Sequence, residues 1–402
     1  MTHEYDVAVI GAGTGGYVAA IKAAQLGLKV AVVEKQKALG GTCLIWGCIP
    51  TKALLEHAHA LKVVQNVKEW GVTIAEGAVG IDMGQVQARK DKVVSGLTRG
   101  IEFLFKKNKI EWIKGTARLT GQGRIQVSNG EGIGLNAREI IIATGSAPRS
   151  VPGVEIDRKR IITSDEAIGL REVPRSLIIL GSGAVGVEFA SIFRRFGSEV
   201  TLIELLPRLV PNEDEAISAE LEKSFRKQRI AVHTGTKVMK AVASSSGVQV
   251  DAQGPDGATR QFQGDYLLVA TGRGPVTTGL GVEELDLQLE RGYVRVDELY
   301  RTNVAGLSAI GDVITLGGLH PQLAHVSSAE GIVTAERLAK RETRPLNYSQ
   351  VPACTYCDSE IGSVGLTERE ARERGYDVRV GTFPFGVLAR AKIAGEDEGF
   401  VK

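Results

Sequence analysis

This chain has few cysteines, a net charge close to zero and no long apolar run. Four cysteines among 402 residues are too few for the disulfide framework of a small secreted protein. A net charge of +2, without a basic run interleaved with aromatic residues, argues against a nucleic-acid partner. No apolar stretch approaches the roughly 20 residues that span a bilayer, so we expect no membrane segment.

The beginning and the length of the chain suggest a cytoplasmic protein of several domains. Met1–Asp6 pass directly into a strand-like run, which leaves no room for a signal or transit peptide. The 402 residues are too many for a single hydrophobic core, so two to four domains are expected.

A dinucleotide-binding pattern follows at once. The β-branched run Asp6–Ile10 reads as a strand, the turn Gly11–Gly16 follows it, and Tyr17–Leu26 is helical in character. A second strand, Lys29–Val33, ends at Glu34. A lone Gly-x-Gly-x-x-Gly is weak support, but here the strand, the helix and the acid supply the required context.

Each residue of this pattern has a physical role. Gly11 permits the tight turn, Gly13 lets the backbone approach a pyrophosphate at the helix N-terminus, and Gly16 permits close packing of helix and strand. Glu34 is placed to accept hydrogen bonds from a ribose.

The same pattern recurs 170 positions later. Leu177–Leu180 is a strand, Val187–Phe196 a helix and Glu199–Ile203 a second strand. The counterparts of the first glycines and acid are Gly181, Gly183, Gly186 and Glu204. A repeat this regular is not a chance match, so we expect two dinucleotides to bind one chain.

A second phrase is also repeated. Ile140–Gly145 and Leu267–Gly272 are both buried-strand patterns that end in Ala-Thr-Gly. They are either two ordinary strand ends or paired exits from the two nucleotide domains. Their common position, downstream of a glycine fingerprint, favours paired exits.

Two cysteines four residues apart lie between these units. Cys43 and Cys48 precede a helix-prone run, and Pro50 suits the start of a helix. A helix N-terminus lowers the pKa of a nearby thiol, so Cys48 is placed to be a thiolate and Cys43 is close enough to form a disulfide with it. A structural disulfide and two ordinary buried thiols are the alternatives. The position favours a redox-active pair.

The last part of the chain has a different layout. Leu307–Asp312 reads as a strand that ends in a carboxylate, and Ser328–Ala339 as a helix. A small α+β domain then begins, with strands expected at Val351–Tyr356 and Val378–Phe383 and a helix at Glu368–Arg374. The chain ends within a further strand-like run.

Other candidate features have simpler explanations. The mixed-charge run Val210–Arg229 predicts an amphipathic surface helix. Cys354 and Cys357 have the spacing of a redox or zinc pair, but residues three apart on a strand point to opposite faces. We therefore expect no metal site.

Together these residues resemble the pyridine nucleotide–disulfide oxidoreductases, flavoproteins with a redox-active dithiol, over essentially the whole chain. The ending Cys48–Lys52 is most similar to the dihydrolipoamide dehydrogenase branch. The resemblance implies FAD and NAD as cofactors, and Glu204 favours NAD because a carboxylate repels the 2′-phosphate of NADP.

The resemblance also implies particular residues. The catalytic set is Cys43, Cys48, Lys52 and Glu188, in which Lys52 pairs with Glu188 beside the flavin. FAD-binding features are matched by Gly11, Gly13, Gly16, Glu34, Thr144, Gly145 and Asp312, and the NAD fingerprint by Gly181, Gly183, Gly186 and Glu204. Further implied cofactor-binding residues are Lys52, Gly115, Ala324, Gly272 and Arg273.

The implied fold is α/β, with two Rossmann-like domains, for FAD and NAD, and the start of a C-terminal α+β dimerisation domain. We expect the first part of the FAD domain at 1–148, the NAD domain at 149–273, a return segment of the FAD or central domain at 274–345 and a dimerisation domain, cut short, at 346–402. A homodimer and a lipoyl-bearing acyltransferase or glycine-cleavage carrier are the implied partners.

Three features depart from the family. Ile45 replaces the usual asparagine after the first cysteine, and Trp46 is similar to transhydrogenase-like members, which lack the second cysteine. The chain ends at Lys402, before the family's catalytic His-Pro motif, so we infer that it is truncated. None of its six histidines is predicted to replace that residue, since His320 has no acid at the expected spacing.

Three functions remain open from the sequence. The first is flavin-dependent oxidation of dihydrolipoamide. The second is a related flavin reductase that acts on another disulfide, on a metal ion or between nicotinamides. The third is a flavin-binding subunit without turnover. The absence of the catalytic histidine favours it, whereas the intact dithiol and the Lys52–Glu188 pairing argue against it.

Overall fold

The structure is a computed structural model that describes residues 2–75, 77–128, 132–318 and 320–402. The chain forms two compact units, each α/β in character. The first contains 1–50, 88–148 and 273–348, and the second contains 51–87, 149–272 and 349–402. The four-part domain division given above stays a prediction. In the described part of the chain, no helix combines the length and apolar character that crossing a bilayer requires.

A largely parallel sheet forms the centre of the first unit. Its strand order is β3-β2-β1-β6, and β19 pairs with β6, all in parallel. The bounds are β1 Thr2–Ile10, β2 Val30–Glu34, β3 Glu111–Lys114, β6 Ile133–Ile142 and β19 Leu307–Ala309. An antiparallel extension joins the same sheet, as β4 Thr116–Gly121 and β5 Arg124–Ser128. The valines of β1 and β2 and Ile10 are buried, which fits a sheet covered on both faces.

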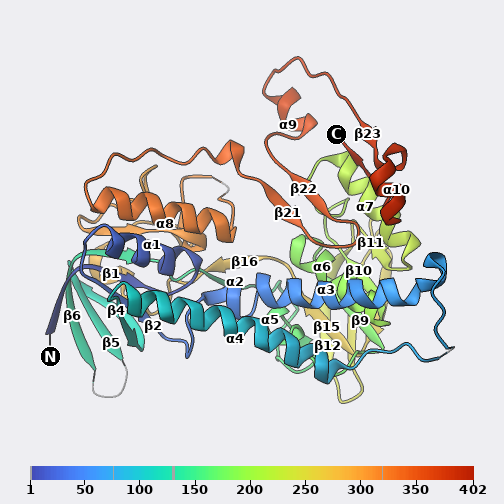
Figure 1. Ribbon diagram of the computed structural model, residues 1–402, viewed down its shortest axis with the longest axis horizontal. Helices are drawn as coiled ribbons and strands as arrows, with labels where there is room; N and C mark the ends of the chain where they lie inside the picture. The colour runs from blue at the N-terminus through green and yellow to red at the C-terminus, as the bar shows by residue number, and fades with distance from the viewer. Residues whose placement is uncertain (1, 76, 129–131, 319) are drawn as a thin grey trace. The chain divides into compact units, whose positions relative to one another are not determined.

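Two helices pack together closely in this unit. Figure 1 shows α1 (Thr14–Gln25) and α8 (Ala324–Leu338) side by side. They meet through glycine, because a Cβ on Gly331 would lie 2.6 Å from the carbonyl oxygen of Gly15. The buried face of α1 is otherwise alanine, so the two helix backbones approach closely.

Three more helices follow in sequence. They are α2 (Gly41–Ile45), α3 (Cys48–Gln65) and α4 (Met83–Lys107). The first residues of α3 belong to the first unit and the others to the second, while α4 runs from the second unit into the first. The predicted dithiol stretch therefore spans a short helix, a tight turn and the start of a long helix.

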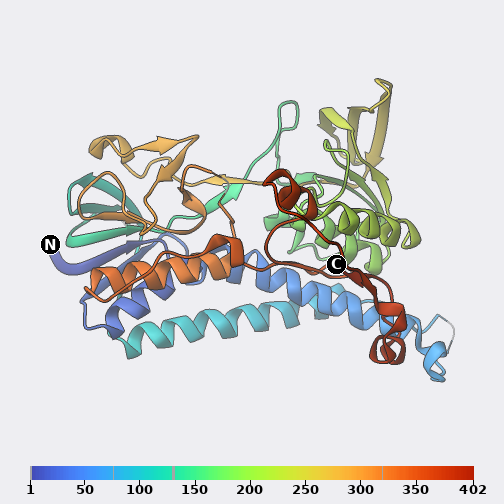
Figure 2. The same ribbon diagram turned by 90° about the horizontal axis from the view of Figure 1, so that it is seen from above.

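The second unit repeats the nucleotide-binding topology. Its parallel sheet has the order β11-β10-β9-β15-β8. The bounds are β8 Ile161–Ile162, β9 Ser176–Leu180, β10 Glu199–Ile203, β11 Ala231–His233 and β15 Tyr266–Val269, with helix α6 at Ala184–Phe196. An antiparallel sheet shares its core and lies beside it in Figure 2, with strands β12 Lys237–Ala243, β13 Val248–Gln253 and β14 Thr259–Gly264.

Two secondary-structure predictions are wrong at their ends. Helix α7 begins at Glu215, not at Val210, because Val210 has a left-handed φ of 39° and Asp214 caps the helix. The predicted strand Val378–Phe383 is reduced to β23, Phe383–Pro384, which pairs with β24, Phe400–Val401. Val380 is 47% exposed and lies next to no paired strand, so its β-branched side chain gains no packing.

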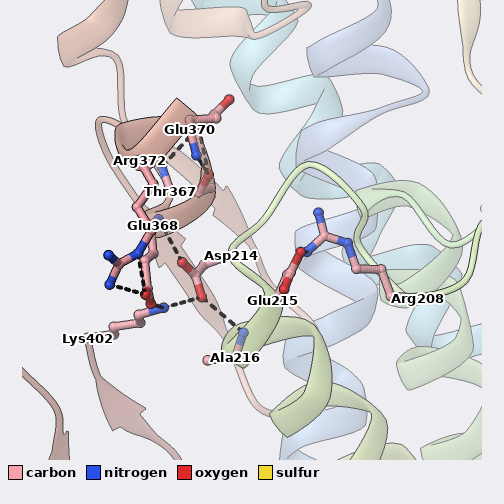
Figure 3. Close-up of polar contacts among 9 residues, drawn as sticks. All are labelled: Arg208, Asp214, Glu215, Ala216, Thr367, Glu368, Glu370, Arg372 and Lys402. Carbon is pink, nitrogen blue, oxygen red and sulfur yellow. Dashed lines mark hydrogen bonds and ion pairs between the residues drawn. The ribbon is translucent and has the colours of Figure 1, made fainter. Parts of the chain in front are cut away.

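The segment after Ser349 carries short elements. Its strands β21 (Ala353–Thr355) and β22 (Ile361–Ser363) form a hairpin, followed by α9 (Glu368–Glu373) and α10 (Ala389–Ala394). Figure 3 shows how the start of α9 is fixed to α7 (Glu215–Lys227) within the second unit. Asp214 accepts hydrogen bonds from the backbone N–H of Ala216 at 2.9 Å and of Glu368 at 3.0 Å. Its carboxylate also contacts Lys402 Nζ at 2.7 Å.

The Asp214 contacts predict a pH dependence of stability. Burial alone would raise the pKa of Asp214, but the hydrogen bonds from Lys402, Glu368 and Ala216 outweigh it and lower the pKa. A group with a lowered folded pKa stabilises the fold above its unfolded pKa, about 4, and loses that contribution as pH falls through the folded pKa.

We expect Asp214→Asn to lower the melting temperature at pH 7 and the difference from the wild type to shrink as the solution is acidified below about pH 4. Asparagine still caps a helix, whereas Asp214→Ala should lose about a further 1 kcal/mol. Thermal unfolding followed by circular dichroism at several pH values measures both. An unchanged difference at acidic pH would contradict the role of the charge.

Candidate active site

The two cysteines of the predicted redox pair lie at consecutive helices. Cys43 is in α2, and Cys48 is the first residue of α3, which has 18 residues. Both are half-buried thiols. Pro50 lies in the first turn of α3, where its missing N–H costs nothing. Cys48 is thus at the positive end of a long helix dipole, as the sequence predicts.

The first glycine-rich turn connects β1 to α1 with the predicted geometry. Gly11 has a φ of 99°, which favours glycine, and Gly13 is the N-cap of α1. A Cβ on Gly16 would overlap the carbonyl oxygen of Gly11, so only glycine fits there. A Cβ on Gly13 would come no nearer to other atoms than 3.9 Å, so this glycine leaves a cradle that a side chain would fill.

The second turn repeats this geometry. Gly181 has a φ of 102°, and a Cβ on Gly186 would overlap the Gly181 carbonyl oxygen. Gly183 is the N-cap of α6 and its Cβ position faces open space. Both cradles fit a pyrophosphate bound by backbone N–H groups at a helix N-terminus.

The two acids hold equivalent positions. Glu34 accepts hydrogen bonds from the backbone N–H of Ala12 at 2.7 Å and of Gln36 at 2.8 Å. Glu204 accepts corresponding bonds from Ser182 and Leu206, both at 2.8 Å. Each Glu34 oxygen keeps a second lone pair for a ribose hydroxyl, and so does Glu204 Oε1, whereas Glu204 Oε2 also accepts from the Ser182 hydroxyl at 2.8 Å. The acids therefore brace the glycine turns, a role that sequence reasoning missed.

Gly115 lies beside the first acid. Its N–H donates to the Glu34 carbonyl oxygen at 3.0 Å, and its φ is 149°. Ala324 is the first residue of α8. Both belong to the first unit. Gly272 has a φ of 101° and accepts the N–H of Arg149 at 3.0 Å in the second unit.

A chain of side chains joins several predicted cofactor-binding positions in the first unit. Asp312 accepts a hydrogen bond from the Ser146 hydroxyl at 2.5 Å, and that hydroxyl accepts one from Arg273 Nε at 2.8 Å. Arg273 also reaches Thr42, next to Cys43, at 3.4 Å. Thr144 donates to the Val276 carbonyl oxygen at 2.7 Å. Ser146 and Thr42 were not predicted, although each adjoins a residue that was.

The structure confirms that Lys52 and Glu188 meet. Lys52 Nζ lies 2.8 Å and 2.9 Å from the two carboxylate oxygens of Glu188. The Glu188 side chain is 6% exposed and that of Lys52 is 35% exposed. The pair joins α3 to α6 within the second unit and leaves the ammonium partly accessible.

His320 has no acid at the expected spacing of five residues, but the structure gives it one ten residues further along. Its Nε2 lies 2.6 Å from Glu330 Oε1, because the first turns of α8 bring Glu330 back beside it. Tyr348 donates to the same oxygen at 2.7 Å, and the Gly311 N–H donates to Glu330 Oε2 at 2.6 Å. The sequence did not predict this pair, because the family's acid lies five residues after its histidine whereas Glu330 lies ten residues after His320.

Three hydrogen-bonding groups surround the Glu330 carboxylate. Glu330 is fully buried, and its two oxygens contact the Gly311 N–H, the Tyr348 hydroxyl and His320 Nε2. His320 Nδ1 is buried without a hydrogen-bond partner among the described residues. Burial, followed by the Glu330 charge, raises the pKa of Tyr348, so its hydroxyl remains a donor.

The other candidates remain outside the site. His57 Nδ1 lies 2.7 Å from the Ala53 carbonyl oxygen and His59 is exposed. Cys354 is exposed and Cys357 is buried. Burial raises the pKa of Cys357 above its usual range, which makes it unreactive. Within the ranges that the structure describes, no three His, Cys, Asp or Glu residues gather as a metal site.

Comparisons of sequence support the geometry. The profile of the pyridine nucleotide-disulphide oxidoreductases matches residues 5–331, and that of their dimerisation domain matches residues 351–402. The dihydrolipoyl dehydrogenase of Bacillus subtilis is 44% identical over all of this chain and 86% of its own length. Dihydrolipoyl dehydrogenase 3 of Pseudomonas aeruginosa is also 44% identical, over 100% of this chain and 85% of its own.

Solved structures have the same fold. LpdA from Mycobacterium tuberculosis superposes with a TM-score of 0.89 at 26% identity, over 99% of this chain and 86% of that one. The HOCl-induced flavoprotein disulfide reductase RclA from Escherichia coli gives a TM-score of 0.86 at 29% identity, over 98% and 85%.

Proposed function

Because the chain belongs to the pyridine nucleotide-disulphide oxidoreductase family, we propose that it oxidises dihydrolipoamide to lipoamide with FAD and NAD+. The observation that carries the proposal is the half-buried pair formed by Cys43 in α2 and Cys48 at the start of α3, in a chain with two dinucleotide cradles. The names of the relatives, at 44% identity, support the substrate.

The dithiol performs the exchange. In the oxidised enzyme, one substrate thiolate attacks the Cys43 sulfur, the Cys43–Cys48 bond breaks and Cys48 leaves as a thiolate. The second substrate thiolate then displaces Cys43 and closes the lipoamide disulfide. Two electrons enter the enzyme as the reduced cysteine pair, while one of the substrate's two protons is taken up by the displaced Cys43 thiolate and the other is released to the solvent. The first turn of α3 favours the Cys48 thiolate.

Bound FAD would supply the two-electron chemistry that links the dithiol to NAD+. The first unit binds FAD: Gly11, Gly13 and Gly16 admit the pyrophosphate, and Glu34 accepts from the ribose. Asp312, held by Ser146, accepts from a ribityl hydroxyl. Thr144, Gly145, Gly115, Ala324 and Arg273 complete this set in our proposal.

The second unit binds NAD+. Gly181, Gly183 and Gly186 admit its pyrophosphate, and Glu204 selects the 2′-hydroxyl over a 2′-phosphate. Gly272 lies in the loop that follows β15, the strand that pairs with β9. Lys52, held by Glu188, presents its charge to the flavin.

We further propose a homodimer, supported by the match of residues 351–402 to a dimerisation domain. The substrate-bearing partner is then a lipoyl-carrying acyltransferase or glycine-cleavage carrier. The cytoplasmic location stays a prediction from the sequence.

The test is to mix the FAD-loaded protein with dihydrolipoamide and NAD+ and to follow NADH formation. We expect turnover, together with a long-wavelength thiolate-to-flavin band when dihydrolipoamide is added without oxygen. Oxidised glutathione with NADPH, and NADH with NADP+, serve as competing substrate pairs. Turnover of one of those pairs without dihydrolipoamide activity would assign the protein to a related reductase.

The Glu330 cluster predicts a specific effect on FAD. Glu330→Gln replaces one acceptor oxygen by an N–H group, so it can no longer accept from Gly311, Tyr348 and His320 together. Glu330 supports the Gly311–Asp312 turn, and Asp312 is the residue that we assign to FAD. Loss of a hydrogen bond to a charged group costs about 1.5–3 kcal/mol, so we expect the variant to bind FAD about tenfold or more weakly. The dissociation constant is measured from flavin fluorescence.

Tyr348→Phe is the matched control. It removes one donor to Glu330 but leaves the Gly311 contact, so FAD affinity should change less than about threefold. Equal losses in the two variants would show that the cluster supports the fold in general and not the Gly311–Asp312 turn.

A further inference from the structure

The Lys52–Glu188 pair has a third member that lies in the segment matching the dimerisation domain. Tyr356 directly follows β21. Its backbone N–H donates to Glu188 Oε1 at 2.9 Å. The Lys52 Nζ lies 4.5 Å from the centre of the Tyr356 ring, within the range of a cation–π interaction. One residue therefore contacts both partners of the ion pair.

The chain around Tyr356 is held in place by buried neighbours and by contacts of Asp358. Thr355 and Cys357, its neighbours, are 5% and 2% exposed. The Asp358 N–H donates to the Ser191 hydroxyl on α6 at 2.9 Å, and Lys62 on α3 contacts the Asp358 carboxylate at 2.7 Å. These contacts all lie in the second unit, and they anchor the chain immediately after Tyr356. The ring can therefore limit the freedom of the Lys52 ammonium.

The phenol is neutral at physiological pH. The charge of nearby Cys354, followed by partial burial, raises the pKa of Tyr356. A neutral aromatic face attracts a cation, and the 41% exposed ring and Lys52 both line a cleft of about 1820 Å³ in this unit.

We propose that Tyr356 is a positioning residue of the redox centre, which holds the Lys52 ammonium by its ring and Glu188 by its backbone, so that the dimerisation segment sets the charge presented to the flavin. The inference rests on the proposed function, in which Lys52 faces the flavin. Reduction adds negative charge to the flavin ring, and a fixed cation beside it favours the reduced form.

The test is a reduction equilibrium. The FAD-loaded protein is titrated without oxygen against a reference dye, with NADH as the source of electrons. Tyr356→Leu removes the ring and keeps the backbone N–H, so we expect the equilibrium to shift about threefold to tenfold toward oxidised flavin. Tyr356→Phe keeps the ring and should remain within about twofold of the wild type. Tyr356→Met carries the test if the leucine variant does not retain flavin.

A double-mutant cycle separates positioning from a general structural effect. In a Lys52→Met background, the ring has no cation to hold, so Tyr356→Leu should cause no further shift. The proposal is overturned if the leucine variant matches the wild type, if phenylalanine fails to preserve the equilibrium, or if the shift persists without Lys52. The titration uses no dihydrolipoamide. Its result can therefore be interpreted even if dihydrolipoamide proves not to be the substrate.

Discussion

Cys48→Ser is expected to lower dihydrolipoamide-dependent NADH formation on the order of 10³-fold or more, while the protein still binds FAD and NAD+. Serine has nearly the same shape as cysteine, so α3 should begin unchanged. It can form neither the disulfide with Cys43 nor a thiolate at neutral pH. The exchange therefore loses both its leaving group and its path for electrons to the flavin.

A second reaction shows whether the effect is confined to the dithiol. Transfer of a hydride from NADH through the flavin to an artificial dye does not involve either cysteine. Dye reduction by Cys48→Ser should therefore stay within about threefold of the wild type, because neither nucleotide site loses a contact. If dye reduction fell as far as lipoamide turnover, Cys48 would support the flavin site and not the exchange.

The other cysteines supply matched controls. Cys43→Ser should abolish lipoamide turnover to the same extent, since the substrate attacks this sulfur. Cys354→Ser changes an exposed thiol on β21 and should leave turnover within about twofold. A Cys48→Ser protein that kept a tenth of the wild-type turnover would refute the redox assignment.

Much of the fold could be predicted from the sequence where one pattern specified the local structure. The strands β1 and β9 end at Ile10 and Leu180, as the runs of β-branched and other apolar residues predict, although β1 begins at Thr2 and not at Asp6. The helices begin three residues earlier than predicted, at Thr14 and Ala184, because Gly13 and Gly183 are already the N-caps. Helix starts inside a glycine motif are hard to predict because glycine is a poor helix former.

The parts that could not be predicted depend on distant residues. Asp214 caps α7 and also binds the Glu368 N–H, 154 positions away, so the boundary of α7 is set by a tertiary contact. The failed strand Val378–Phe383 has suitable residues but no neighbouring strand to pair with along most of its length. Local propensity is a weak guide where pairing decides the outcome.

The candidate site shows the same division. The resemblance placed Lys52 opposite Glu188, although 136 positions separate them, and the structure brings them together at 2.8 Å. It did not place His320 against Glu330, because that contact depends on the turn that precedes α8. Tyr356 was likewise missed, since its backbone N–H and ring contact the ion pair from another element.

Gly183→Ala is expected to raise the KM for NAD+ about 10- to 100-fold without lowering the stability of the protein. The Cβ position of Gly183 meets no atom within 4 Å, so the methyl group fits the fold itself. It would occupy the space that a pyrophosphate needs at the N-terminus of α6, and one extra methyl group in a tightly packed site costs about 1–3 kcal/mol. Steady-state kinetics with varied NAD+ and thermal unfolding measure the two effects.

The internal repeat supplies a control in each direction. Gly13→Ala should weaken FAD by a similar factor and leave the KM for NAD+ unchanged, because Gly13 holds the same N-cap position in the first unit. Gly186→Ala should lose both NAD+ binding and stability, since its Cβ overlaps the Gly181 carbonyl oxygen. We expect Gly183→Ala to weaken NAD+ binding and retain FAD, and Gly13→Ala to weaken FAD binding and retain NAD+ binding. That result would assign one nucleotide to each glycine turn. Loss of both nucleotides in either variant would contradict separate sites.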